Sequence, residues 1–222
     1  MRKWGILISI IYALIVLGLL VPIAVLLVGP SGPSDLRDFS QGILATYREW
    51  LVWVPIVIIL GGQALLLFLS VDTSQKRLKP RAHILLSCSV AAILTALLTF
   101  AVIGSIGVSV QWDKFGEDSF ASPFLFFGAA WIFWGIVFYL FLRNSSAVVN
   151  RIMSWLLKGS ILELLVAVPC HVIVRRRHDC SAPAVTSFGI VTGIAIMLLS
   201  FGPSVLFLYK KRLDAYASRS AP

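Results

Sequence analysis

Long apolar stretches separated by short polar segments run along the whole chain. Each stretch has about twenty residues or more, which is the length that an α-helix needs to cross the hydrocarbon core of a bilayer. The stretches that we assign to membrane helices are residues 4–28, 50–71, 83–108, 122–142, 152–174 and 183–208. The pattern therefore predicts an all-α, polytopic transmembrane helix bundle.

The first stretch, Trp4 to Val28, follows Arg2 and Lys3 and so has the general plan of a signal peptide. Its uncharged run is much longer than the roughly 7–15 apolar residues of a signal peptide, and no small-residue cleavage site follows it. We therefore predict that this segment is retained as a membrane helix.

A different pattern follows the Gly/Pro-rich break after the first stretch. From Leu36 to Tyr47 the apolar residues recur at helical spacing, and aspartate and arginine occupy the opposite side. A short helix with one apolar and one charged face is typical of a segment that lies in the membrane surface. We predict such a helix here, outside the spanning set.

Residues 144–182 leave two topologies open. The apolar run from Ile152 to Val174 is long enough to span, but it contains Lys158, Glu163 and Pro169. We prefer six spans, in which this run crosses the membrane. The alternative is five spans with this run as an interfacial or re-entrant segment.

Composition and charge agree with the membrane assignment. Hydrophobic residues make up 59% of the chain and charged residues 13%, whereas soluble domains carry about 25% charged residues. The net charge of +9 would favour nucleic-acid binding in a soluble protein. Here the basic residues form short clusters between apolar stretches, where loops meet anionic headgroups. We expect the lipid bilayer and other membrane subunits as partners, and not nucleic acid.

The distribution of basic residues predicts an orientation. We treat residues 1–208 as a single bundle and 209–222 as a short, basic, disordered C-terminal tail. With six spans and both termini in the cytoplasm, 13 of the 19 Lys and Arg residues lie inside, including those of the loop 72–82. Because the loops are short, we expect a multi-pass protein of a bacterial inner membrane.

Glu163 is an acidic residue within a hydrophobic stretch. A charge at the bilayer centre costs roughly 2.5–3.5 kcal/mol on insertion scales, so such a group usually faces the bundle interior and has a role. We predict a polar pocket at Glu163 that serves as a proton or cation relay; the alternative is a structural partner for Lys158. Gln63, beside Gly61 and Gly62, is a second candidate for such a pocket or for an interhelical hydrogen bond.

Several residues of metal-ligating type gather near the end of the fifth stretch. Neutral imidazole and thiolate suit zinc, copper or haem iron. The candidate ligands are Cys170, His171, His178 and Cys180. On a continuous helix the two histidines would lie about 10.5 Å apart, too far to share one ion without a break in the helix. The spacing is no established zinc motif, and the Cys-x-x-Cys-His haem attachment sequence is absent.

Arg175, Arg176 and Arg177 form the densest run of charge next to an apolar stretch. They could bind an anionic lipid headgroup or an acidic partner, or they could act only as a topological stop. Further along the chain, Gly189 and Gly193 have the Gly-x-x-x-Gly spacing that lets two membrane helices approach closely.

The sequence contains no P-loop, no Gly-x-Ser-x-Gly and no His-Glu-x-x-His motif, and its halves show no inverted repeat. We therefore expect a non-enzymatic membrane component that binds partners or passes a small solute or ion near Glu163. The alternative is a membrane protein that binds a metal or haem, or carries out redox chemistry. Its ligands would be Cys170, His171, His178 and Cys180. The sequence points to no particular cofactor.

Overall fold

The computed structural model describes residues 2–28, 36–75, 81–110, 122–143, 148–177 and 182–219, and within these ranges it contains helices and no strand. The elements are α1 (Arg2–Ile15), the π-helix η1 (Val16–Leu20), α2 (Val21–Val28), α3 (Leu36–Arg48), α4 (Trp50–Gln75), α5 (Arg81–Ser109), α6 (Ser122–Leu142), α7 (Val148–Arg176) and α8 (Ala182–Arg219). The prediction of an all-α bundle is confirmed.

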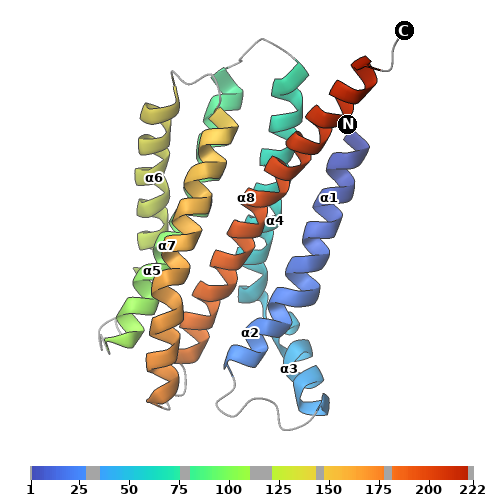
Figure 1. Cartoon of the computed structure of the whole chain (residues 1–222). Helices are drawn as coiled ribbons and strands as arrows, with labels where there is room; N and C mark the ends of the chain where they lie inside the picture. The colour runs from blue at the N-terminus through green and yellow to red at the C-terminus, as the bar shows by residue number, and fades with distance from the viewer. Residues whose placement is uncertain are drawn as a thin grey trace.

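Six helical segments in this part of the chain are long and apolar enough to cross a membrane. They are Gly5–Leu27, Trp50–Leu67, Ile84–Ser109, Phe124–Leu142, Arg151–Arg176 and Ala182–Phe201. The fifth segment, in α7, runs beside α5 and α8 as one unbroken helix (Figure 1). The six-span prediction is therefore confirmed, and the five-span alternative with a re-entrant segment is wrong.

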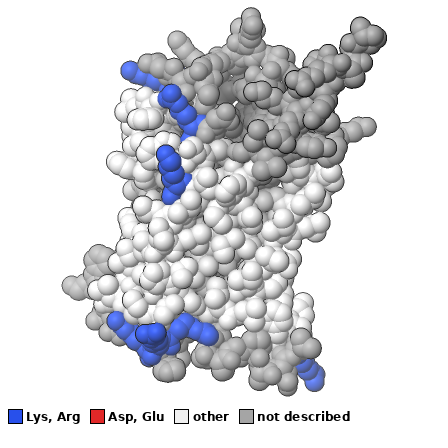
Figure 2. Space-filling model, in the orientation of Figure 1, with Lys and Arg blue, Asp and Glu red and all other residues white. Residues whose placement is uncertain are grey.

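Helices α5, α7 and α8 form the centre of the bundle. Helix α6 packs mainly on α5, while α4 and the α1–α2 segment lie on the other side (Figure 1). Both termini lie at the same end, as an even number of spans requires. The space-filling view shows Lys and Arg in the upper part and along the lower end of the molecule, with an uncharged belt between them (Figure 2).

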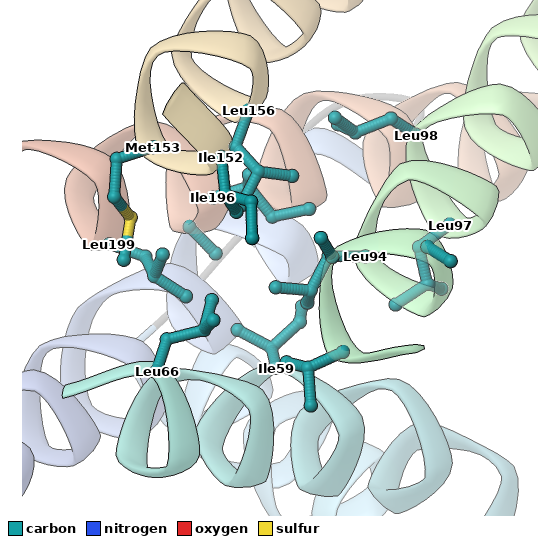
Figure 3. Packing of buried hydrophobic residues seen from close by; sticks show 14 of the residues in the cluster. Ile59, Leu66, Leu94, Leu97, Leu98, Ile152, Met153, Leu156, Ile196 and Leu199 are labelled. Atoms are coloured by element: carbon teal, nitrogen blue, oxygen red, sulfur yellow. The ribbon is translucent and has the colours of Figure 1, made fainter. Parts of the chain in front are cut away.

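The core is an apolar cluster in one half of the bundle (Figure 3). Fully buried side chains from α4, α5, α7 and α8 meet there, among them Leu66, Leu94, Ile152, Leu156 and Ile196. Lipid chains are as apolar as leucine, so the cluster gains little from the hydrophobic effect. Close van der Waals packing is what holds these helices together.

The first membrane segment is not a uniform α-helix. Its backbone adopts a π-turn at Val16–Leu20, and the Leu17 carbonyl accepts a hydrogen bond from the Tyr47 hydroxyl of α3. Burial raises the pKa of Tyr47, so the hydroxyl keeps its proton and remains a donor. The predicted surface helix α3 is thus fixed to the irregular turn of the first span.

Helix α8 continues as far as Arg219, where the sequence predicted a disordered tail from residue 209. The stretch from Ser204 to Arg219 contains no glycine or proline and is rich in leucine, lysine, arginine and alanine. These residues favour helix, so nothing in the local sequence ends α8 where its apolar run ends.

Candidate functional site

Glu163 lies on the inward face of α7. Its side chain is 0% exposed, and the residues one and two turns away, Ser160, Ala167 and Cys170, are buried as well. Leu165, on the opposite face of α7, is 71% exposed. This is the 3.6-residue period of a helix with one face in the bundle and the other towards lipid. The prediction that Glu163 faces the interior is confirmed.

The carboxyl group of Glu163 fits into a notch on α8 formed by Gly189 and Gly193. A Cβ atom on Gly193 would overlap with Glu163 Oε2, and one on Gly189 would lie 3.0 Å from Oε1. The Gly-x-x-x-Gly spacing therefore does more than bring α7 and α8 together. It leaves room for an acidic side chain at the place where the two helices touch.

Ser105 of α5 faces the same place. Its Oγ atom would also lie 3.0 Å from a Cβ atom on Gly189, and its side chain is 0% exposed. Among the described residues, neither oxygen of Glu163 nor the Ser105 hydroxyl has a hydrogen-bond partner. A buried polar group left without a partner costs about 1–3 kcal/mol. Such a group in a packed bundle marks a candidate functional site.

Lys158 is not the partner of Glu163. Its side chain is exposed, whereas both Glu163 oxygens are buried without a partner in the described part of the chain. The two are five positions apart along α7, and at about 100° per residue this places them about 140° apart around the helix. The structural alternative for Glu163, a pair with Lys158, is therefore wrong.

Cys170 and His171 also lie on the buried face of α7, as predicted. His171 Nδ1 is 2.8 Å from the Thr186 hydroxyl of α8, and the Cys170 thiol is free. His178 and Cys180, the other predicted metal ligands, lie outside the described residues. In the ranges that are described, no three His, Cys, Asp or Glu side chains gather closely enough to hold a metal ion. The metal or haem site stays a prediction.

Gln63 is buried in α4 but is not part of the Glu163 site. The adjacent Gly62 packs against Leu94 of α5. Ser105, which marks the level of Glu163, comes eleven residues later in α5, or about 16 Å along the helix axis. The structure therefore does not bring the two predicted polar residues together.

Two of the three consecutive arginines bind the ends of neighbouring helices. Arg175 Nη1 donates to the Leu27 carbonyl in the last turn of α2, at 3.3 Å. Arg177 Nη1 donates to the Ser109 carbonyl at the end of α5, at 2.6 Å. Positive charge at a helix C-terminus satisfies free carbonyl groups and opposes the helix dipole. Arg176 is exposed and remains the candidate for a headgroup or partner contact.

Arg177→Ala should lower the free energy of unfolding by about 1 kcal/mol, because the Ser109 carbonyl loses a charged donor at a helix end. Arg176→Ala is the matched control. It removes the same charge from the next residue and should change stability by less than about 0.5 kcal/mol. Thermal unfolding of the detergent-solubilised protein measures both. Equal stabilities for the two variants would contradict a capping role for Arg177.

Sequence reasoning missed Ser105 and Thr186. Each is one hydroxyl residue in a helix with several others, and a hydroxyl can bond to its own helix one turn back. No pattern in the sequence separates these two from their neighbours. Their importance comes from their position opposite Glu163 and His171, which only the packing of α5 and α8 against α7 determines.

Six apolar helices of this length make the protein a multi-pass integral membrane protein. Comparison of the chain with protein-family models, with curated proteins and with solved structures gave no match. The function proposed below therefore rests on the Glu163 site itself.

Proposed function

We propose that this protein is a non-enzymatic membrane component that binds a proton at Glu163 and passes it through the helix bundle. The observation that carries the proposal is the Glu163 carboxyl group, fully buried between α5, α7 and α8, with no partner for either oxygen among the described residues. An ionised carboxylate in such a place is strongly disfavoured, and the protonated form is neutral. Intramembrane acidic residues commonly mark proton or ion pathways.

The geometry favours a proton over a metal cation. Oε2 of Glu163 is packed against Gly193, and Oε1 shares its side of the notch with the Ser105 hydroxyl. Hard cations such as Mg²⁺ and Ca²⁺ need about six or more oxygen ligands. A proton needs one oxygen and very little space. The two carboxyl oxygens of Glu163 and the Ser105 hydroxyl are too few ligands for such a cation, but they suit the binding of a proton.

We also propose a location and an orientation. Short loops and the absence of a eukaryotic targeting signal favour a bacterial inner membrane. The N-terminus and the loop 72–82 are assigned to the cytoplasm, because this places 13 of the 19 basic residues inside. The end of α7 with its three arginines then lies on the opposite side of the membrane.

Proton flux in proteoliposomes tests the proposed function. With a potassium diffusion potential and a pH-sensitive dye inside the vesicles, the wild-type protein should acidify or alkalinise the lumen according to the sign of the potential. Glu163→Gln keeps the size of the side chain and removes its proton-binding site, so the rate should fall to that of protein-free vesicles. Glu49→Gln, the same change at an exposed residue, should conduct like wild type.

Infrared difference spectroscopy provides a second measurement that does not depend on flux. A protonated carboxyl group inside the bundle should give a carbonyl band that is present in wild type and in Glu49→Gln and absent in Glu163→Gln. If wild type lacks this band, or if Glu163→Gln conducts protons as fast as wild type, the proposed function is wrong.

A further inference from the structure

We propose that protons reach Glu163 from the end of the bundle where α7 ends and α8 begins, through His171 and Thr186, while apolar packing closes the other half. This inference rests on the proposed function, because it names the route to the same site. The two halves of the α5–α7–α8 interface differ in polarity on either side of Glu163.

The half that precedes Glu163 in α7 and follows Gly193 in α8 is closed by apolar side chains (Figure 3). Leu94, Ile152, Leu156, Ile196 and Leu199 are each at most 1% exposed there. In this conformation the packed apolar layer offers a proton no groups that exchange hydrogen bonds, so passage of the proton to the far side requires α7 and α8 to separate there.

Three buried hydroxyl groups in the closed half donate to backbone carbonyls. Ser160 donates to the Leu157 carbonyl, and Ser200 donates to the Ile196 carbonyl. The Tyr12 hydroxyl donates to the Ala195 carbonyl across the α1–α8 contact. These three hydroxyl groups are therefore occupied with backbone acceptors.

The other half contains small and polar residues. Ala167 and Gly189 lie next to the Glu163 carboxyl: a Cβ atom on Gly189 would be 3.3 Å from Ala167 Cβ and 3.0 Å from Ser105 Oγ. His171 follows Glu163 by eight residues in α7, or about 12 Å along the axis. The interval between the two titratable groups is thus bordered by small side chains, and the contacts at Gly189 are close.

His171 and Thr186 extend the polar route to the end of the bundle. His171 is 7% exposed, and its Nδ1 is 2.8 Å from Thr186 Oγ1. The Thr186 oxygen lies 3.2 Å from the carbonyl of Pro183, in the first turn of α8. An imidazole can accept a proton on one nitrogen and release one from the other. The pair therefore has the chemistry to connect the interior with the bundle end.

Two cations lie near His171, and each is itself bound to the end of another helix. In the described part of the chain, α8 presents the Thr186 hydroxyl to His171, and the neighbouring residue in α7 is the buried Cys170. The nearby cations are Arg175 and Arg177, and each donates to the C-terminal carbonyl groups of another helix. The negative ends of those helix dipoles offset part of the positive charge at the mouth of the route.

The rate of hydrogen–deuterium exchange at the Glu163 carboxyl group tests the route. Mixing the reconstituted protein with D2O shifts the infrared band of the protonated carboxyl, and the time course gives the rate. His171→Gln keeps a polar side chain that can bond to Thr186 but cannot carry a proton between two nitrogens. It should slow exchange by roughly a hundredfold, the low end of what a positioned proton-transfer group contributes. Ser160→Ala, in the closed half, should exchange at the wild-type rate.

The outcomes separate this inference from the proposed function. A carboxyl band that exchanges equally fast in wild type and in His171→Gln overturns the route and leaves proton binding at Glu163 intact. Slower exchange in Ser160→Ala than in His171→Gln overturns it as well, because it places the entry in the other half. The absence of the band in wild type overturns the proposed function. If His171→Gln does not fold, Thr186→Val decides by the same comparison, since it removes the hydroxyl group beside the imidazole.

Discussion

Gly193→Ala is expected to destabilise the protein by roughly 1–3 kcal/mol, the usual cost of overpacking a well-filled interior. The new Cβ atom would overlap with Glu163 Oε2 and lie 2.9 Å from Leu164 Cγ. Helices α7 and α8 cannot keep their contact unless the carboxyl group moves out of its notch. Unfolding of the purified protein in detergent, by heat or by denaturant, measures the change.

Two controls make this result specific to the notch. Gly128→Ala in α6 should be nearly neutral, because a Cβ atom there meets nothing within 4 Å among the described residues. In a double-mutant cycle, Gly193→Ala should cost less in a Glu163→Ala background, since the carboxyl group that it displaces is gone. An unchanged cost in that background would show that Glu163 does not occupy the notch.

The helices themselves were well predicted from the sequence. The predicted bounds of the fourth stretch, Ser122 to Leu142, are those of α6, because an uninterrupted apolar run there ends at Arg143. The π-turn at Val16–Leu20 could not be predicted. Pro22 follows the turn and has no N–H to donate to the Gly18 carbonyl, but a proline does not by itself specify a π-turn.

The contacts of the three consecutive arginines could not be predicted from the sequence, for a different reason. In the sequence, Arg175 to Arg177 are one run of charge at the end of a span. In the structure, the carbonyl groups that accept from Arg175 and Arg177 belong to residues 148 and 68 positions away in the chain. A charge run indicates a membrane boundary, but which helix ends meet it depends on how the spans pack.

The candidate site was predicted in part for an energetic reason. Glu163 could be identified because a carboxyl group in an apolar run is costly unless it faces the interior. Gly189 and Gly193 could be identified as a packing motif. That the carboxyl group lies in the glycine notch, beside Ser105, follows from the rotation of α7 and α5 relative to α8, which no residue type specifies by itself.

Glu163→Met is expected to raise the free energy of unfolding by roughly 1–3 kcal/mol, because it removes a buried polar group that has no partner. Methionine is unbranched and close to glutamate in length, so its side chain can fill the notch beside Gly193. The variant should also lose the infrared band and the proton flux. More stable protein without activity is the expected result for a residue kept for its chemistry and not for the fold.

Glu163→Gln is the matched comparison for this experiment. Its amide group enters the same notch with its polar atoms equally unpartnered, so its stability should stay close to that of wild type while its flux is lost. Thermal unfolding of the three proteins in one detergent should therefore place Glu163→Met above wild type and Glu163→Gln beside it. A Glu163→Met variant less stable than wild type would mean that the carboxyl group contributes a bond to the native state, and the site would then be structural. The order of the three stabilities thus separates a functional from a structural role of Glu163 without a transport measurement.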